Sequence, residues 1–157
     1  MKRPTLRIAV SAWLGLSAHC ALSQQPIAIA TVQHLSFGRF AAGTGGTVTV
    51  SPSGMRTAGP GVVLLSSGLA GEARYTISGD PLAVFSLSLP ADDAVTLSDD
   101  HGHYMPINLF RSQPPEGLAE LGAGGTRTLA VGATLNASAG QAAGNYASTF
   151  SILVEYN

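Results

Sequence analysis

The densest group of residues that could do chemistry is the stretch Asp99-Asp100-His101-Gly102-His103. On a strand, residues two apart share a face, so the imidazoles of His101 and His103 could bind one metal ion together. The same composition is also that of an ordinary turn between two strands, and no second pair of ligands accompanies it. We therefore expect neither a functional metal site nor a cofactor.

Other catalytic motifs are not found in the sequence. It has no Gly-x-Ser-x-Gly elbow, and the glycine-rich stretches at 43–46 and 122–125 are followed by strand patterns rather than by the helix that a phosphate loop needs. A Ser-His-Asp triad stays open, because its members can be distant in sequence, but nothing selects one. We expect the protein not to be an enzyme.

The first 23 residues have the pattern of a secretory signal peptide. A basic start is followed by an apolar run at 8–18 and by the small residues Ala21 and Ser23. The run is shorter than the roughly 20 residues that a membrane-spanning helix needs. We expect cleavage after Ser23, with a cut beside Cys20 as the alternative. The protein is then exported to the periplasm, the cell surface or the medium, with no membrane span in the mature chain.

The mature chain, residues 24–157, is expected to be a single domain. It has no cysteine and no lysine, and its five arginines and nine acidic residues give a net charge of −4. Nucleic acids are bound through clustered lysine and arginine, so this charge argues against a nucleic-acid partner.

Short runs with the period of a strand follow one another along the mature chain, separated by turn signals. These runs are rich in Val, Thr, Ile, Leu and aromatic residues, and they lie at 46–51, 62–67, 73–78, 83–89, 94–98, 105–110 and 127–135. No stretch predicts an amphipathic helix, and residues 118–121 are at most a single helical turn. The pattern predicts an all-β fold, an immunoglobulin-like antiparallel β-sandwich of about seven to nine strands.

The last fourteen residues carry the clearest strand alternation. After Gly144, alternate positions are expected to share one face of a strand from 146 to 156, and these are Tyr146, Ser148, Phe150, Ile152, Val154 and Tyr156. The edge of such a final strand must be covered by something other than a later strand. The C-terminus is therefore a place where assembly could be encoded.

The segment 24–37 predicts a second terminal strand. Ile27, Ile29 and Thr31 fall on one face, and small residues fall on the other. Two interpretations are open: residues 27–32 are the first strand of their own sandwich, or they are a donor strand that inserts in a neighbouring molecule.

Five blocks, in this order, resemble the secreted bacterial proteins grouped as domain of unknown function 4402. The blocks are LSFG (35–38), GGTVTVSPSG (45–54), ARYTISG (73–79), LAVGATL (129–135) and QAAGNY (141–146). The resemblance covers nearly the whole mature chain. It implies export and a β-sandwich, and it supplies no activity.

The C-terminus also resembles that of chaperone–usher pilus subunits, in which a glycine stands fourteenth from the end and a tyrosine stands second-last. Gly144 and Tyr156 occupy these positions. The resemblance implies that the last strand pairs with a periplasmic chaperone and later with the N-terminal extension of a like subunit. The common members carry a disulfide, which the mature chain lacks.

These observations lead to one functional hypothesis and one alternative. The hypothesis is a non-enzymatic structural subunit of a fimbria-like surface assembly that polymerises by β-strand addition, with residues 27–32 as donor and 146–156 as acceptor. The alternative is a stand-alone secreted β-sandwich binding module, for example for glycans.

Overall fold

A computed structural model describes residues 24–66 and 68–157, so the expected signal peptide, residues 1–23, lies outside the described residues. The described chain forms twelve strands. They are β1 (Ala28–Gln33), β2 (Phe40–Ala42), β3 (Gly46–Val50), β4 (Arg56–Ala58), β5 (Val62–Leu64), β6 (Ala73–Ser78), β7 (Val84–Ser88), β8 (Val95–Ser98), β9 (Tyr104–Gln113), β10 (Gly117–Glu120), β11 (Thr126–Ala137) and β12 (Leu153–Tyr156).

The longest strand, β11, organises the largest sheet. Along one edge it pairs first with β6 and then with β3, and along its other edge it pairs with β9. Gly132 lies where the partner changes from β6 to β3, and a Cβ there would collide with the carbonyl oxygen of Val50. Because only glycine lets the two backbones approach so closely, Gly132 allows one strand to serve both ends of the sandwich.

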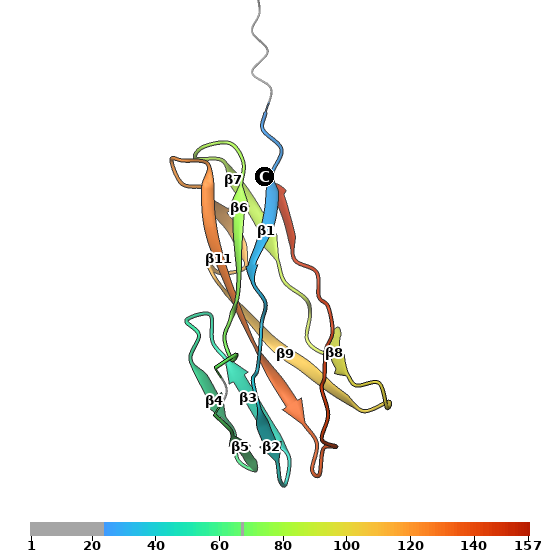
Figure 1. The fold of residues 1–157 in the computed structure, drawn as a ribbon. Coiled ribbons are helices and arrows are strands. Elements are labelled where there is room, and N and C mark those ends of the chain that lie inside the picture. Colours follow the sequence, from blue (N-terminus) through green and yellow to red (C-terminus); the bar gives the residue numbers. More distant parts are fainter. Residues whose placement is uncertain (1–23, 67) are drawn as a thin grey trace, which may run out of the picture.

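All strand pairs are antiparallel, and they make three sheets. The seven-stranded sheet runs in the order β1-β6-β11-β3-β4, with β9 and β8 added beside β11. A three-stranded sheet has the order β10-β7-β12, and β2 pairs with β5. Figure 1 shows an elongated sandwich in which β1 and the C-terminal strand lie at the same end of the molecule.

The core lies between the layers, where alternate side chains of each strand point inward. Ile77 on β6 and Leu129 on β11 are fully buried, as are Phe85 on β7 and Val48 on β3. The large sheet and the three-stranded sheet therefore share one apolar core. The inward-facing alternate residues of both sheets contribute to it.

The predicted all-β antiparallel sandwich is confirmed, but the number of strands is twelve rather than seven to nine. Two of the additional strands, β2 and β4, have three residues each and lie between turns, where periodicity is too short to detect. Residues 117–120 form β10 rather than a helical turn, because their backbone pairs with β7. Among the described residues, none belongs to a helix that could cross a membrane.

Candidate functional site

The first side of the candidate site is β1, which contains the predicted donor residues Ile29 and Thr31; Ile27 directly precedes it. In the part of the chain that the structure describes, β6 is the one strand that pairs with β1, so the other edge of β1 is free. All six side chains of β1 are exposed. The structure thus places these residues in their own sheet, on a strand that is bound through its backbone and covered very little.

The second side of the site is β12, the final strand. It pairs with β7 alone among the described strands, from Leu153 opposite Ser88 to Tyr156 opposite Phe85. Its second edge therefore offers unpaired backbone groups, as the edge of β1 does. Figure 1 shows the C-terminal segment running beside β1 and its continuation along the length of the molecule, and we call the strip between them the seam.

The expected strand from 146 to 156 is corrected by the structure, since only residues 153–156 form a strand. Before them, a single bridge joins Ala147 to Ser98, with hydrogen bonds of 3.0 and 3.1 Å. In this antiparallel register, residues 148–150 would lie opposite residues 97–95 of β8, but among the described residues the pairing stops at the single bridge. The alternation is strong in the sequence, but alternation alone does not make a ladder.

The side-chain directions nevertheless follow the expected alternation. The predicted inward residues are half-buried, except for the exposed Ser148, and the residues between them are exposed; the half-buried ones are Tyr146, Phe150, Ile152, Val154 and Tyr156. The Phe150 ring packs against Phe110 at a centroid distance of 5.2 Å. The C-terminal segment therefore presents an apolar face to the core that nothing in the described chain fully covers.

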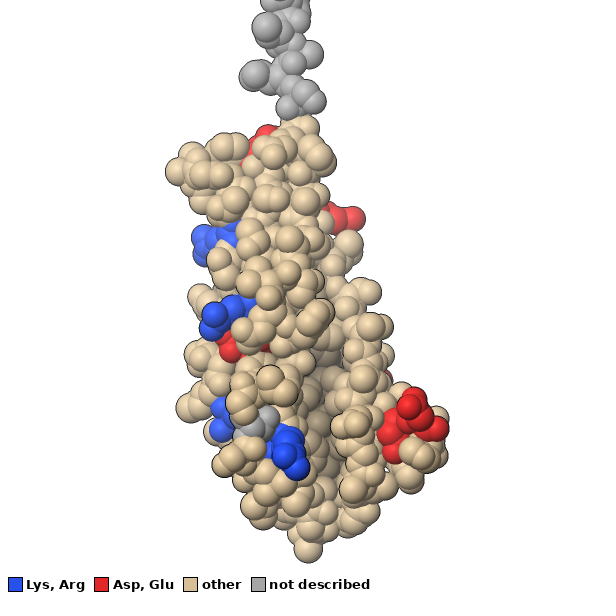
Figure 2. Space-filling view, viewed as in Figure 1, with Lys and Arg blue, Asp and Glu red and all other residues tan. Residues whose placement is uncertain are grey.

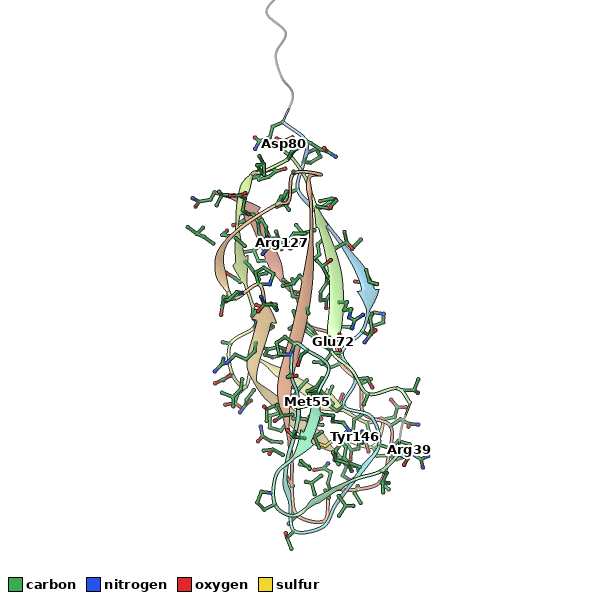
Figure 3. The ribbon with its side chains drawn as sticks, turned by 90° about the vertical axis from the view of Figure 1, so that its left-hand side faces the viewer. Arg39, Met55, Glu72, Asp80, Arg127 and Tyr146 are labelled. Atoms are coloured by element: carbon green, nitrogen blue, oxygen red, sulfur yellow. The ribbon has the colours of Figure 1, made fainter. Side chains whose placement is uncertain are left out.

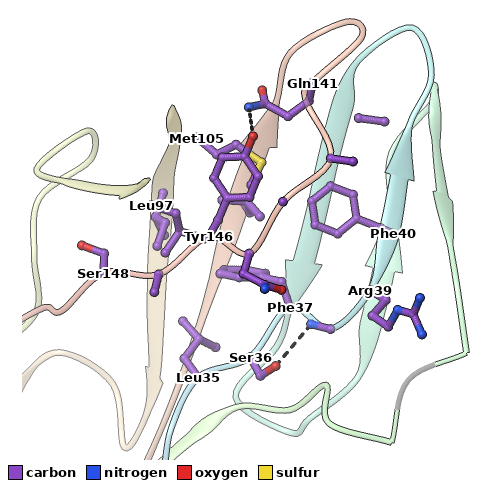
Figure 4. A pocket seen from close by; sticks show the side chains of 18 of the residues that line it. Leu35, Ser36, Phe37, Arg39, Phe40, Leu97, Met105, Gln141, Tyr146 and Ser148 are labelled. Carbon is purple, nitrogen blue, oxygen red and sulfur yellow. Dashed lines mark hydrogen bonds between the residues drawn. The ribbon is translucent and has the colours of Figure 1, made fainter. Parts of the chain in front are cut away.

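The seam widens into a groove of about 870 Å³ at the end of the molecule opposite Asp80. Its walls are residues 35–42, which continue from β1, and residues 141–148 with Phe150. Its floor contains the apolar side chains of Leu97, Met105, Ile107 and Leu135. Figure 4 shows Phe37, Phe40 and Tyr146 among the side chains that line this groove.

The groove is nearly free of charge. Arg39 is the single charged residue among the described residues that line it. Figure 2 shows a hollow on this face, with basic side chains gathered along one side of the molecule and acidic ones at a protruding turn on the other. A groove with an apolar floor and a single charged residue, continuous with the seam, can take up side chains of an extended segment that pairs with a free strand edge in the seam.

The groove walls are held by Arg56 on one side and by Tyr146 on the other. The Arg56 guanidinium donates hydrogen bonds to the carbonyl oxygens of Phe37 (3.0 Å) and Leu65 (2.8 Å), which ties one wall to β4. On the other wall, the Tyr146 hydroxyl donates to Ala142 O and accepts from Gln141 Nε2, both at 2.9 Å. Sequence reasoning singled out Tyr146 but missed Arg56, whose role depends on contacts distant in the chain.

Gly144 lies beside the turn that carries the two histidines. A Cβ on Gly144 would stand 3.3 Å from Asp99 Oδ2, so a glycine lets the C-terminal segment approach this turn. Gly144 is thus explained by local packing next to the Ala147–Ser98 bridge.

The histidine turn is organised by hydrogen bonds to the Asp99 carboxylate. Asp99 Oδ1 accepts hydrogen bonds from the backbone N–H groups of His101 (2.9 Å) and His103 (2.8 Å), and Oδ2 lies 2.7 Å from His103 Nδ1. Desolvation raises the pKa of the Asp99 carboxyl, but these hydrogen bonds outweigh it and lower the pKa to about 2. Within residues 24–66 and 68–157, no group of three or more His, Cys, Asp or Glu could hold a metal ion.

At the far end of the seam, Tyr156 joins the two terminal segments. Its hydroxyl donates to Gln25 O at 2.6 Å and accepts from Asp80 N at 2.8 Å. The predicted residue Tyr156 is therefore brought next to the start of the predicted donor, whereas Tyr146 lies at the groove end of the molecule (Figure 3). The sequence did not predict that Gln25 and Asp80 take part in this contact.

Comparison with known proteins gives one result. No curated protein and no solved structure matches this chain. Residues 27–156 match the family described as domain of unknown function (DUF4402), which covers the strands and the whole seam. The chain belongs to the DUF4402 family.

Proposed function

We propose that this protein is an exported, non-enzymatic structural subunit of a fimbria-like surface assembly, and that it polymerises by β-strand addition at the seam. One observation carries the proposal: the inward-facing apolar side chains of the C-terminal segment stay half-buried, and the strand edges on both sides of the seam are free among the described strands. A β1 strand from another copy that takes the place of the molecule's own β1, and pairs in addition with the free edge of β12, would cover these side chains and fill that edge.

The proposed donor is β1 of a second copy, with Ile27, Ile29 and Thr31 on one face. In its own molecule β1 is bound to β6, so donation requires exchange of β1 between copies. Exchange of an identical element is a low-cost route to assembly, because the ladder lost in one molecule is regained in the next. Head-to-tail exchange leaves one site open at each end, and it therefore builds a filament rather than a closed ring.

A periplasmic chaperone is the proposed partner before assembly. A free strand edge beside a half-buried apolar face, as at β12, is a template for unwanted pairing, and covering it would keep the subunit soluble. Deleting residues 24–32 should abolish polymers and leave a monomer that still binds the chaperone. Loss of the fold in every context would contradict the proposal.

Cross-linking between copies tests the donor and acceptor directly. The mature chain has no cysteine, so single cysteines can be introduced cleanly. A mixture of Thr31→Cys and Val154→Cys should give disulfide-linked dimers under oxidising conditions. Met55→Cys, which is 64 % exposed and lies just before β4, is the control partner for Thr31→Cys. Equal yields from the two mixtures would rule out strand addition at the seam.

One observation favours the alternative, a stand-alone binding module for a ligand such as a glycan. β1 completes its own sheet in this structure, and the groove formed by the residues that follow it is lined by aromatic side chains, including Phe37, Phe40 and Tyr146. Aromatic faces are suited to stacking on sugar rings. A purified mature protein that stays monomeric at all concentrations and binds oligosaccharides in the groove would favour this function.

A further inference from the structure

β1 is bound weakly along its length, whereas the residues just before it are held by several hydrogen bonds. Its six side chains are exposed, with Ile29 at 39 % and Val32 at 65 %, so little apolar area is gained when β1 joins its sheet. The backbone pairing with β6 also shifts register between Thr31 and Gln33. Contacts at the ends of β1 therefore contribute a larger share of the free energy that keeps it on its sheet than they would for a buried strand.

A ring of three hydrogen bonds holds the residues just before β1. The Tyr156 hydroxyl donates to Gln25 O at 2.6 Å, Asp80 N donates to the same hydroxyl at 2.8 Å, and Gln25 N donates to Asp80 Oδ1 at 3.0 Å. Both backbone groups of Gln25 are thereby bound. The ring joins three distant parts of the chain: the segment before β1, the turn between β6 and β7, and the end of β12.

The turn is shaped to admit the tyrosine. A Cβ on Gly79 would collide with the Tyr156 hydroxyl, so glycine next to Asp80 leaves the space that the ring occupies. The Tyr156 backbone is paired opposite Phe85, a fully buried residue of β7. The acceptor strand thus supplies the group that holds the start of the donor strand of the same molecule.

We propose that the Tyr156 hydroxyl, Asp80 and the backbone of Gln25 form a latch that keeps β1 in its own molecule and so limits strand exchange. The inference rests on the proposed function, because exchange of β1 is what the latch regulates. Release of β1 breaks both hydrogen bonds of Gln25. Each such bond shifts the equilibrium between held and released β1 by roughly fivefold.

Amide hydrogen exchange of the monomeric mature protein tests the latch. In Tyr156→Phe two of the three hydrogen bonds are lost, including the one to Gln25 O, and the amides of β1 that bond to β6 should exchange roughly five- to tenfold faster. The amides of β11 should be unchanged. Tyr104→Phe, which alters a 62 % exposed tyrosine on β9, is the matched control and should behave as wild type. Unchanged exchange of β1, or equal acceleration of β1 and β11, would overturn the latch.

Two substitutions at Asp80 separate the latch from general destabilisation. Asp80→Ala removes the acceptor for Gln25 N and should speed exchange of the β1 amides, whereas Asp80→Asn keeps an oxygen at that position and should restore slow exchange. If both variants release β1 to the same extent, the hydrogen bond to Gln25 is not what holds it, and the proposal fails.

The rate of assembly, followed by light scattering, distinguishes failure of the latch from failure of the proposed function. Tyr156→Phe should polymerise roughly five- to tenfold faster than wild type. If no variant polymerises while Tyr156→Phe still frees β1, assembly is refuted and the latch as a hold on β1 stands. If wild type polymerises and Tyr156→Phe does so at the same rate, the latch does not regulate exchange.

Discussion

The central strand β11 and the C-terminal segment carry similar apolar alternation but have different surroundings. The inward residues of β11, such as Leu129 and Val131, are fully buried, whereas those of the C-terminal segment, such as Ile152 and Val154, are half-buried. β11 has neighbours on both edges, and β12 has one. Alternation therefore tells which face of a strand points inward, and the neighbours decide whether that face is covered.

The difference separates two roles within one domain. β11 holds the sandwich together, since it pairs with β3, β6 and β9. β1 and β12 lie at the margins of their sheets and leave the seam between them open. A subunit that exchanges strands needs both: a core that survives the exchange, and margins that are only weakly held.

The largest expected effect comes from a matched pair of substitutions, Val131→Ala and Val154→Ala. Val131 is fully buried, so its loss of two carbons and the cavity left behind should lower the free energy of unfolding by about 2.5 kcal/mol. Val154 is half-buried, and the same change should lower it by less than about 1 kcal/mol. Denaturant unfolding of the monomer measures both. Equal losses would mean that the seam is covered as well as the core.

A somewhat smaller effect is expected at Gly132, where β11 changes partner. Gly132→Ala should lower the free energy of unfolding by about 2 kcal/mol, because its Cβ meets the Val50 carbonyl oxygen and the backbones must separate. Gly124→Ala is the control, since a Cβ there meets no atom within 4 Å. Thermal unfolding of the two variants checks this, and a Gly132→Ala protein as stable as the control would refute the close approach.

The smallest effect is a pH dependence at the turn beside the C-terminal segment. The pKa of Asp99 is about 2 in the folded protein and lies near 3.8 when the group is free, so the folded state binds the proton less readily. The stabilisation is therefore fully present above about pH 4 and is lost as the pH falls through about 2. Asp99→Asn should remove this dependence in acid unfolding of the monomer. A variant with the same acid profile as wild type would contradict it.

Much of the fold could be read from short-range pattern. The expected runs at 46–51, 73–78 and 127–135 all correspond to strands, because alternating β-branched and aliphatic residues favour a pleated, half-buried backbone. The predictions were less accurate where strand pairing, rather than the propensity of the residues, decides whether a segment forms a strand. Residues 117–120 became β10 by pairing with β7, whereas residues 146–152 pair with β8 only through the bridge of Ala147 to Ser98 and do not become a strand.

The candidate site was predicted unevenly for the same reason. The inward positions of the C-terminal segment were visible in the sequence, since they depend only on alternation, and the likeness of Gly144 and Tyr156 to a pilus subunit depends only on spacing. The groove wall at 35–42, the bracing by Arg56 and the contact of Asp80 with Gln25 were not visible. Each depends on residues that are distant in the chain and meet only after folding.

The amino-acid sequence alone thus specifies an antiparallel β protein of the DUF4402 family and the face that each terminal strand turns inward. Only the tertiary structure shows that β1 pairs with its own β6, that the edges of β1 and β12 are free of partners among the described strands, and that Tyr156 binds the start of β1. The physical reason is that periodicity is a local property of the chain, whereas pairing, register and cover depend on which distant segments come to lie side by side.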